Sequence, residues 1–414
     1  MTGRDDLEVH IELDGATVLA GHAQFQRSRG RFQGTTFQYE TGYLARPSAY
    51  EIDPALRLTS GTQYTQGLPG AFSDSAPDRW GRNLIQKQER AISRQDSRAA
   101  RTLDDVDYLI GVSDVTRQGA LRFRTDADAP FLDADHRVPK LVHLPELLRA
   151  ADSAVGDADD YAAVKALLAA GTGSLGGARP KASVLGTDGR QLIAKFPHHT
   201  DAWDVMAWEA TALDLAAEAG VTVPAHRLSR VDGRHLLLLE RFDRSPGGRI
   251  GYMSAMTVLG LHDGDAADYA DIVERLPEMS SRPTRDSHEL FRRVAVSVGI
   301  NNTDDHLRNH GFLRDRAGWS LSPAFDLNPN PEPTLRQTTI AGSDMIDDEA
   351  DGLRALAASC RLSSAGARDQ LRLVIAALET WPDVARRNGV AAPELARFED
   401  SFAAGVDSLR RAAR

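Results

Sequence analysis

The residues best suited to chemistry lie in one short polar stretch, residues 301–310 (NNTDDHLRNH). In this stretch Asp304 is followed by Asn309, and a further carboxylate comes later at Asp326. In phosphoryl transfer, one Asp accepts the proton of the attacking hydroxyl, while an Asn and a second Asp hold Mg²⁺ against the phosphates. Oxygen ligands of this kind are those that Mg²⁺ prefers. The pattern therefore predicts phosphotransfer, with Asp304 as the base and Asn309 and Asp326 as the metal ligands.

Two other interpretations of this stretch stay open. Asp304, Asp305, His306 and His310 could bind the transition metal of a hydrolase, since the two histidines are spaced as on one face of a helix. Against this, Asn309 and the glycine that follows the stretch are unfavourable to a continuous helix. Alternatively, the asparagines and aspartates only form turns in a polar loop.

A glycine-rich segment, residues 171–177 (GTGSLGG), matches the G-x-G-x-x-G pattern, in which glycines let the backbone approach phosphates closely. A dinucleotide-binding loop should open a helix and meet an acidic residue ~20 positions later. Here a predicted β-hairpin follows instead, and Lys195 stands at about that distance. A Walker loop and a G-x-S-x-G nucleophile elbow also fail to match. The segment predicts either a loop that covers a nucleotide, with Lys195 on the α/β-phosphates, or a flexible turn between domains.

Lys195 needs an acidic partner to hold it in a nucleotide site. Apolar residues recur at helical spacing between residues 205 and 219, and Glu209 lies near the edge of that stripe. We expect an ion pair between Lys195 and Glu209; the alternative is that Glu209 is a solvated carboxylate. Lys181 and Lys195 are also notable because the chain has only five lysines, and these two flank the strands after the glycine-rich segment.

The elements that position these residues follow from the hydrophobic pattern. Alternating apolar residues predict strands in the N-terminal part, at residues 7–13, 17–19, 36–43 and 119–123. Helical spacing predicts helices at residues 78–94, from 144 onward, at 201–219 and up to Gly299. Glycine-containing turns predict hairpins at residues 188–189, 232–233 and 315–318.

Composition limits the class of protein. The chain has 414 residues, of which 42% are hydrophobic and 26% charged, so it is long enough for two or three globular domains. Its formal net charge of -10 argues against a protein that mainly grips nucleic acid. Cys360 is the single cysteine, and the sequence shows neither a signal-peptide layout nor an apolar run of ~20 residues. We therefore expect a soluble cytoplasmic protein with no membrane partner.

Several motifs together resemble the HipA kinases of bacterial toxin–antitoxin systems. They occur in the same order and spacing across nearly the whole chain, at residues 72–82, 119–123, 174–181, 193–195, 239–244 (LERFDR), 302–309 and 322–326. The resemblance implies an α+β, kinase-like two-lobed fold with a β-rich N-terminal subdomain and a mainly helical C-terminal lobe. It implies three parts: an N-terminal subdomain at 1–128, a small ATP-binding lobe at 129–240 and a helical catalytic lobe at 241–414.

The resemblance also implies roles for particular residues. Asp304 would be the catalytic base, and Lys195 would be a catalytic lysine that contacts the ATP phosphates. Asn309 and Asp326 would hold Mg²⁺, and residues 239–242 would be the hinge that offers backbone groups to adenine. Ser174 would be an autophosphorylation site, whose added negative charge would repel the ATP phosphates. The implied ATP-binding set is Gly173, Ser174, Gly176, Gly177, Lys181, Lys195, Glu240, Phe242 and His306.

The implied partners are a HipB-like helix-turn-helix antitoxin and a protein substrate, which in this family is an aminoacyl-tRNA synthetase of the glutamyl type. DNA would be contacted only through the antitoxin. The sequence departs from better-known members at residues 179–181, where Pro180 stiffens the loop. Two alternatives stay open: a small-molecule phosphotransferase on a kinase-like fold, and a non-catalytic corepressor that only binds an antitoxin.

Overall fold

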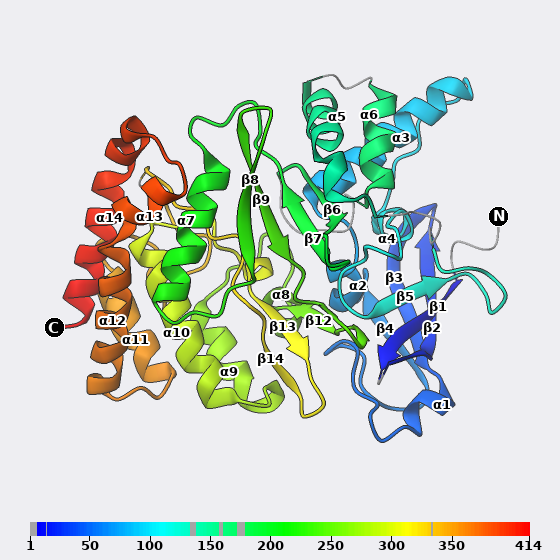
Figure 1. Ribbon diagram of the computed structural model, residues 1–414. Helices are drawn as coiled ribbons and strands as arrows, with labels where there is room; N and C mark the ends of the chain where they lie inside the picture. The colour runs from blue at the N-terminus through cyan, green and yellow to red at the C-terminus, as the bar shows by residue number, and fades with distance from the viewer. Residues whose placement is uncertain (1–5, 14, 133–137, 157–159, 172–178, 333) are drawn as a thin grey trace. The chain divides into compact units, whose positions relative to one another are not determined.

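The computed structural model describes residues 6–13, 15–132, 138–156, 160–171, 179–332 and 334–414 (Figure 1). The chain forms two compact units, each described here by itself. The first comprises Met1–His199, Val231–Gly233 and Leu238–Met253, and the second comprises Thr200–Arg230, Arg234–Leu237 and Ser254–Arg414. Sheets dominate the N-terminal part and helices the C-terminal part, which confirms the predicted α+β class. The three-part division at residues 128 and 240 stays a prediction.

The first unit begins with a five-stranded antiparallel sheet in the order β4-β3-β2-β1-β5. Its strands are β1 (Asp6–Leu13), β2 (Ala16–Ser28), β3 (Arg31–Tyr39), β4 (Thr62–Gln66) and β5 (Leu121–Arg124). In β1 the apolar residues Leu7, Val9 and Ile11 are all buried, because alternate side chains of a strand point to the same face. This is the alternation that the sequence predicted.

The same unit contains six helices among its described residues, α1 (Thr41–Leu44), α2 (Gly70–Asp74), α3 (Arg79–Gln95), α4 (Asp105–Ile110), α5 (Leu144–Gly156) and α6 (Tyr161–Ala169), and a short 3₁₀ turn, η1 (Leu141–His143). Helix α3 starts as predicted, because the Asp78 side chain accepts a hydrogen bond from the Gly81 backbone N–H at 2.8 Å and so caps the helix. The extended segment predicted at residues 36–43 is wrong in its last part, because β3 ends at Tyr39 and α1 follows.

A second sheet has the strand order β6-β7-β9-β8, and the boundary between the two units falls within β9. Its strands are β6 (Lys181–Leu185), β7 (Gln191–Lys195), β8 (His226–Val231) and β9 (Arg234–Glu240). The predicted hairpins at 188–189 and 232–233 are confirmed: Gly189 and Gly233 both adopt the positive φ that such turns require. Beyond β9, the short strands are β10 (Arg244–Ser245), β11 (Gly248–Arg249) and β12 (Tyr252–Ser254).

The second unit is mainly helical (Figure 1). Its helices are α7 (Val205–Glu218), α8 (Ala255–Leu259), α9 (Tyr269–Met279), α10 (Pro283–Gly299), α11 (Glu349–Ser359), α12 (Ser364–Leu378), α13 (Trp381–Arg387) and α14 (Ala392–Ala412). Helix α7 begins later than predicted, because the Asp204 side chain caps it by accepting from the Ala207 N–H at 3.0 Å. The predicted hairpin after the polar stretch is β13 (Gly311–Arg314) with β14 (Trp319–Leu321).

Candidate active site

The polar stretch 301–310 starts where α10 ends, and close helix packing fixes that end. A Cβ on Gly405 of α14 would lie 2.5 Å from the carbonyl oxygen of Gly299 and 2.7 Å from that of Val298. A Cβ on Gly299 itself would lie 2.1 Å from the Leu378 side chain. Because neither Gly405 nor Gly299 has a Cβ, α10 can approach α14 and the Leu378 side chain of α12 this closely. The packing therefore holds the start of the polar stretch in place.

Asn301 makes the turn out of α10 in a left-handed conformation, with φ of 51°, which Asn tolerates better than most residues. Its side-chain Nδ2 donates to the carbonyl oxygens of Asn330 at 2.8 Å and Glu332 at 2.9 Å. A cavity of about 220 Å³ adjoins this turn, with Asn301 and Glu349 in its wall, and none of the predicted site residues lines it. Asn301 thus ties the polar stretch to the segment that follows Asp326.

Asp305 is buried and fully engaged. Its carboxylate accepts hydrogen bonds from the Tyr269 hydroxyl at 2.7 Å, the Ser297 hydroxyl at 3.2 Å and His310 Nε2 at 3.0 Å. Burial alone would raise the pKa of Asp305, but the charge and hydrogen bonds of these neighbours lower it below its ordinary value. Asp305 therefore stays ionised inside the unit, where it fixes the loop.

Asp304 lies in the opposite environment, because its side chain is exposed. Gln337 Nε2 donates to Asp304 Oδ1. The buried Asn309 donates through Nδ2 to the Asp304 carbonyl oxygen at 3.4 Å. The structure thus brings the predicted base and one predicted metal ligand together: Asp304 lies in the loop before a 3₁₀ turn (Leu307–Asn309), and Asn309 ends that turn.

Asp326, the second predicted metal ligand, lies in the same unit beyond β14. The segment leading to it is fixed by the Ala324 backbone N–H, which donates to the Thr222 carbonyl oxygen at 2.8 Å. Asp326 itself is half-buried with φ of 59°, and Asn328 Nδ2 donates to its Oδ1 at 3.3 Å. The role of Asp326 as a metal ligand stays a prediction.

The histidines do not form the hydrolase site considered above. His310 is bonded to the buried Asp305, and His306 is half-buried at the start of the 3₁₀ turn. Over the part of the chain that the structure describes, no group of three or more His, Cys, Asp or Glu residues is arranged to hold a metal ion. The predicted Mg²⁺ ligands Asn309 and Asp326 would not count as such a group, because they include one carboxylate and phosphate oxygens would complete the coordination.

Lys181 and Lys195 lie directly opposite each other on β6 and β7. Both are buried, with 1% and 7% of their surface exposed. Lys181 Nζ donates to Asp78 Oδ2 at 2.7 Å, so its charge already has a carboxylate partner from the start of α3. The predicted contact of Lys181 with ATP stays a prediction. Lys195 belongs to the first unit and the buried Glu209 of α7 to the second, and their ion pair also stays a prediction.

The predicted hinge, residues 239–242, begins in the last two residues of β9. The Arg241 backbone N–H donates to the Gln191 carbonyl oxygen at 3.2 Å, which attaches the hinge to β7. The Glu240 carboxylate accepts from Arg190 Nη1 at 2.6 Å, and the Phe242 ring lies 6.3 Å from that of Tyr252. Four members of the predicted set fall outside the described residues: Gly173, Ser174, Gly176 and Gly177.

Sequence patterns missed several residues of this site. Gln337, which contacts Asp304, lies 33 residues further along the chain, in a segment without any motif. Tyr269, Asn301 and the pairing of Asp305 with His310 were also not predicted. The dense asparagines and aspartates at 301–305 were a signal for a shaped loop, but not for which of the carboxylates is buried.

The α+β fold and the exposed Asp, neighbouring Asn and later Asp on its helical unit are compatible with a kinase-like protein. Comparison with family models narrows the class. The HipA N-terminal domain matches residues 17–103, and the HipA-like C-terminal domain matches residues 173–381. The chain therefore belongs to the HipA family, as the sequence motifs indicated.

Individual relatives agree with this assignment. The chain is 26% identical over 181 residues to Putative kinase Y4mE of Sinorhizobium fredii, and the match covers 40% of this chain and 42% of the relative. It is 27% identical over 227 residues to Putative kinase Y4dM of the same organism, and this match covers 50% of this chain and 55% of the relative. The matched stretches thus span about half the length of these curated relatives.

Among solved structures, the fold is similar to HipA of Shewanella oneidensis MR-1, which was solved with HipB and its operator DNA. The TM-score is 0.68 at 15% identity, and the match covers 98% of this chain and 97% of that chain. At this identity the likeness shows the fold alone.

Within the described residues, no helix combines the length and apolar character needed to cross a membrane.

Proposed function

We propose that this chain is an Mg-ATP-dependent serine/threonine protein kinase and the toxin of a type II toxin–antitoxin pair. The observation that carries the proposal is the placement of Asp304 within a HipA-like C-terminal domain. Its carboxylate is exposed, Gln337 binds one of its oxygens, and its backbone is joined to Asn309. A base that takes a proton from a substrate hydroxyl needs both access and a fixed orientation.

The donor chemistry fits the nucleotide and its metal. The Asn309 amide nitrogen donates a hydrogen bond to the Asp304 carbonyl oxygen. The amide oxygen of Asn309 is a ligand atom of the type that Mg²⁺ prefers. Asp326 would supply the second oxygen ligand, Lys195 would contact the phosphates, and the backbone of residues 239–242 would hold adenine. Bound Mg-ATP would supply the phosphoryl group that is transferred.

The chain's own residues would act on the incoming hydroxyl. Asp304 would orient a Ser or Thr hydroxyl and accept its proton as the oxygen attacks. Gln337 would keep the carboxylate of Asp304 in one rotamer through its hydrogen bond to Oδ1. Asp305 would take no proton, because its carboxylate is buried and engaged by Tyr269 and His310.

We infer the biological setting from the family. The partner would be a HipB-like helix-turn-helix antitoxin, and DNA would be contacted through that antitoxin. The target would be an aminoacyl-tRNA synthetase of the glutamyl type, and the chain would also phosphorylate itself on Ser174. The HipA of Shewanella oneidensis, which was solved together with HipB and operator DNA, supports the choice of partner.

The experiment that tests the proposal is transfer of labelled γ-phosphate from ATP in the presence of Mg²⁺, with and without purified glutamyl-tRNA synthetase, followed by mapping of the labelled residues. Asp304→Asn is the matched inactive control. We expect label on Ser174 and on the synthetase with the wild type, and none with the variant. ATP binding and hydrolysis without protein label would favour a small-molecule phosphotransferase, and a protein that binds antitoxin but no ATP would be the corepressor.

A further inference from the structure

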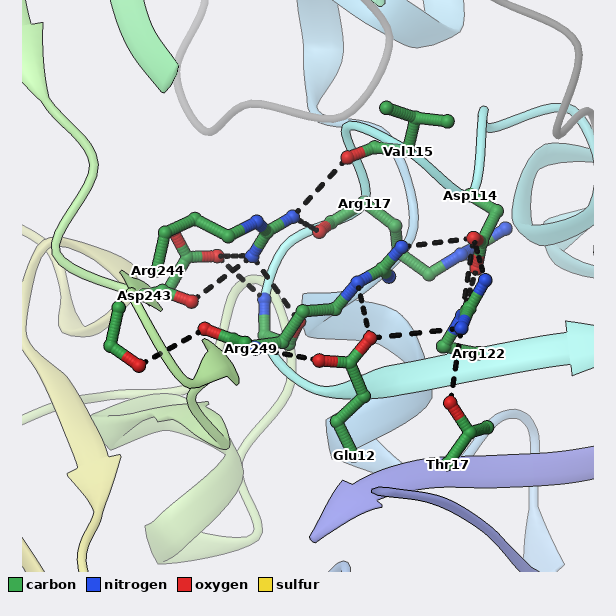
Figure 2. Close-up of polar contacts among 12 residues, drawn as sticks. Glu12, Thr17, Asp114, Val115, Arg117, Arg122, Asp243, Arg244 and Arg249 are labelled. Atoms are coloured by element: carbon green, nitrogen blue, oxygen red, sulfur yellow. Dashed lines mark hydrogen bonds and ion pairs between the residues drawn. The ribbon is translucent and has the colours of Figure 1, made fainter. Parts of the chain in front are cut away.

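The chain carries a cluster of buried and half-buried charged residues that includes the end of the proposed adenine hinge (Figure 2). The cluster contains the carboxylates Glu12, Asp114 and Asp243 and the guanidinium groups of Arg117, Arg122, Arg241, Arg244 and Arg249. All of these residues belong to the first unit. Two of its three carboxylates, Asp114 and Asp243, make separate sets of contacts, and only the set around Asp243 includes a hinge residue, Arg241.

Asp243 is the centre of the set at the hinge. Its Oδ1 accepts from Arg241 Nε at 2.9 Å, and its Oδ2 accepts from Arg241 Nη2 at 2.7 Å, from Arg244 Nη1 at 2.8 Å and from the Gly119 backbone N–H at 2.8 Å. Its side chain is 5% exposed. Burial alone would raise the pKa of Asp243, but the charges of Arg241 and Arg244 lower it well below its ordinary value. Asp243 is therefore a charged, four-fold acceptor.

Arg241 and Arg244, which bind Asp243, also bind the backbone of the N-terminal part of the chain. Arg241 Nη1 donates to the Thr116 carbonyl oxygen at 2.6 Å, and Arg244 Nη2 donates to that of Arg117 at 2.7 Å. Arg117 is fully buried and donates in turn to the backbone carbonyl oxygens of Ser75, Leu109 and Val112. A continuous set of hydrogen bonds thus runs from the hinge to the core of the N-terminal subdomain.

Asp114 forms the other half of the cluster. It accepts from Arg122 Nη2 at 2.7 Å and from Arg249 Nη2 at 2.9 Å, and its side chain is 2% exposed. The Arg249 backbone N–H also donates to Glu12 Oε2 at 2.7 Å. These bonds join the β10–β11 hairpin to β1 and β5. Asp114 thus matches Asp243 in burial and in charge pairing, but among the described residues its side chain bonds to Arg122 and Arg249 and not to residues 239–242.

The physical role of such a cluster is geometric. Buried ion pairs seldom stabilise a fold more than apolar side chains of similar volume would, because desolvation offsets much of their attraction. Their many directional hydrogen bonds instead allow one arrangement of the backbone. A hinge that binds adenine through backbone groups needs that arrangement to be fixed closely.

We propose that Asp243 is a positioning residue for the nucleotide, which fixes the hinge against residues 115–119 and makes the N-terminal subdomain part of the nucleotide site. The inference rests on the proposed kinase function. It predicts that loss of Asp243 weakens ATP binding, whereas loss of Asp114 only weakens the fold.

The test compares Asp243→Asn with Asp114→Asn in the full chain, by melting temperature, by the Kd of a fluorescent ATP analogue, and by KM and kcat for ATP in autophosphorylation. We expect both variants to melt at lower temperature. Only Asp243→Asn should raise Kd and KM for ATP, by about tenfold, with kcat at saturating ATP little changed. Equal Kd and KM in the two variants, at a temperature where both are folded, would overturn the inference.

Arg241→Lys provides a second variant if Asp243→Asn does not fold. It keeps a positive charge beside Asp243 but loses the bidentate fork and the bond to Thr116. KM for ATP should rise in this variant too, and an unchanged KM would equally refute the positioning role. If the wild type itself binds no ATP, the proposed function fails and the inference falls with it. If the wild type binds ATP and all the variants bind it equally well, only the inference fails.

Discussion

At the scale of single residues, the site depends on two neighbouring carboxylates placed in opposite surroundings. Asp304 is exposed and held at one oxygen, whereas Asp305 is buried and accepts three side-chain hydrogen bonds. Asp304 is thus open to a substrate, while Asp305 anchors the loop. Two carboxylates next to each other in sequence can therefore serve different purposes.

Asp305→Asn should destabilise the fold. The amide keeps the shape of the side chain but loses its charge, so the bond to His310 weakens inside the unit. We expect the free energy of unfolding to fall by about 1–3 kcal/mol, as measured by denaturant titration near neutral pH. A variant as stable as the wild type would contradict the anchoring role.

The pH dependence of that difference follows from the pKa of Asp305. Because the folded-state pKa lies below the ordinary Asp value of about 3.9, the carboxylate stabilises the fold at higher pH. This contribution is lost as pH falls through the folded-state pKa, where Asp305 is protonated in both states. The difference in unfolding free energy between wild type and Asp305→Asn should therefore shrink in acid. A difference that stays constant with pH would contradict stabilisation by the ionised Asp305 carboxylate.

Gln337 should affect the rate of transfer rather than ATP binding. Gln337→Ala removes the hydrogen bond that orients the Asp304 carboxylate, so kcat should fall by about tenfold or more while KM for ATP stays the same. Gln337→Glu would place a second negative charge beside Asp304 and raise its pKa. The rising limb of the pH–rate profile should then move to higher pH. An unchanged rate and profile in both variants would exclude Gln337 from the site.

At the scale of elements, the polar stretch depends on the crossing of α10 and α14. Gly405→Ala should force the helices apart, because the new Cβ would meet the carbonyl oxygens of Gly299 and Val298. We expect a loss of stability of about 1–3 kcal/mol and reduced transfer activity, since the start of the polar stretch would shift. The measurements are thermal melting and autophosphorylation.

Gly366→Ala is the matched control for this helix substitution. Gly366 lies in α12, and a Cβ there would meet nothing closer than the Ser363 hydroxyl at 3.3 Å. Because a hydroxyl can give by a few tenths of an ångström, alanine here should change stability by no more than about 0.5–1 kcal/mol. If the two alanine variants melt alike, close packing at Gly405 is not what fixes the polar stretch.

Elements of this fold were predictable where the signal is local. The period of apolar residues, together with turn glycines, predicted α3, α10, the β6–β7 hairpin and the β13–β14 hairpin. The four-residue helix α1 was missed because so short a helix has no periodicity to detect. The order of strands β4-β3-β2-β1-β5 also could not be derived, since it depends on pairing between distant segments.

Contacts between distant residues explain what was missed in the site. The Asp78–Lys181 pair joins residues 103 positions apart, and the Gly119–Asp243 hydrogen bond joins residues 124 positions apart. A motif identifies which side chains could do chemistry, because chemistry constrains residue type and local spacing. It does not show which residues from elsewhere in the chain hold them, because many residue types can serve and no spacing is required.

At the scale of the whole molecule, the formal net charge of -10 limits what the chain can bind alone. DNA is a polyanion, and a protein must place cations against its phosphates to bind it. We therefore expect no retardation of operator DNA by the purified chain alone in a gel-shift assay at ~150 mM salt. When the chain is added to the complex of antitoxin and DNA, that complex should migrate more slowly still. Binding of DNA by the chain alone would contradict the proposed indirect contact.

The central claim is that Asp304 is the base of a phosphotransfer site, and one measurement tests it most directly: the rate of γ-phosphate transfer by Asp304→Asn relative to wild type at saturating Mg-ATP. We predict a loss of about 10²- to 10⁴-fold, with unchanged melting temperature and ATP affinity, because the side chain is exposed and its shape is kept. A folded Asp304→Asn variant that transfers phosphate at nearly the wild-type rate would contradict the account.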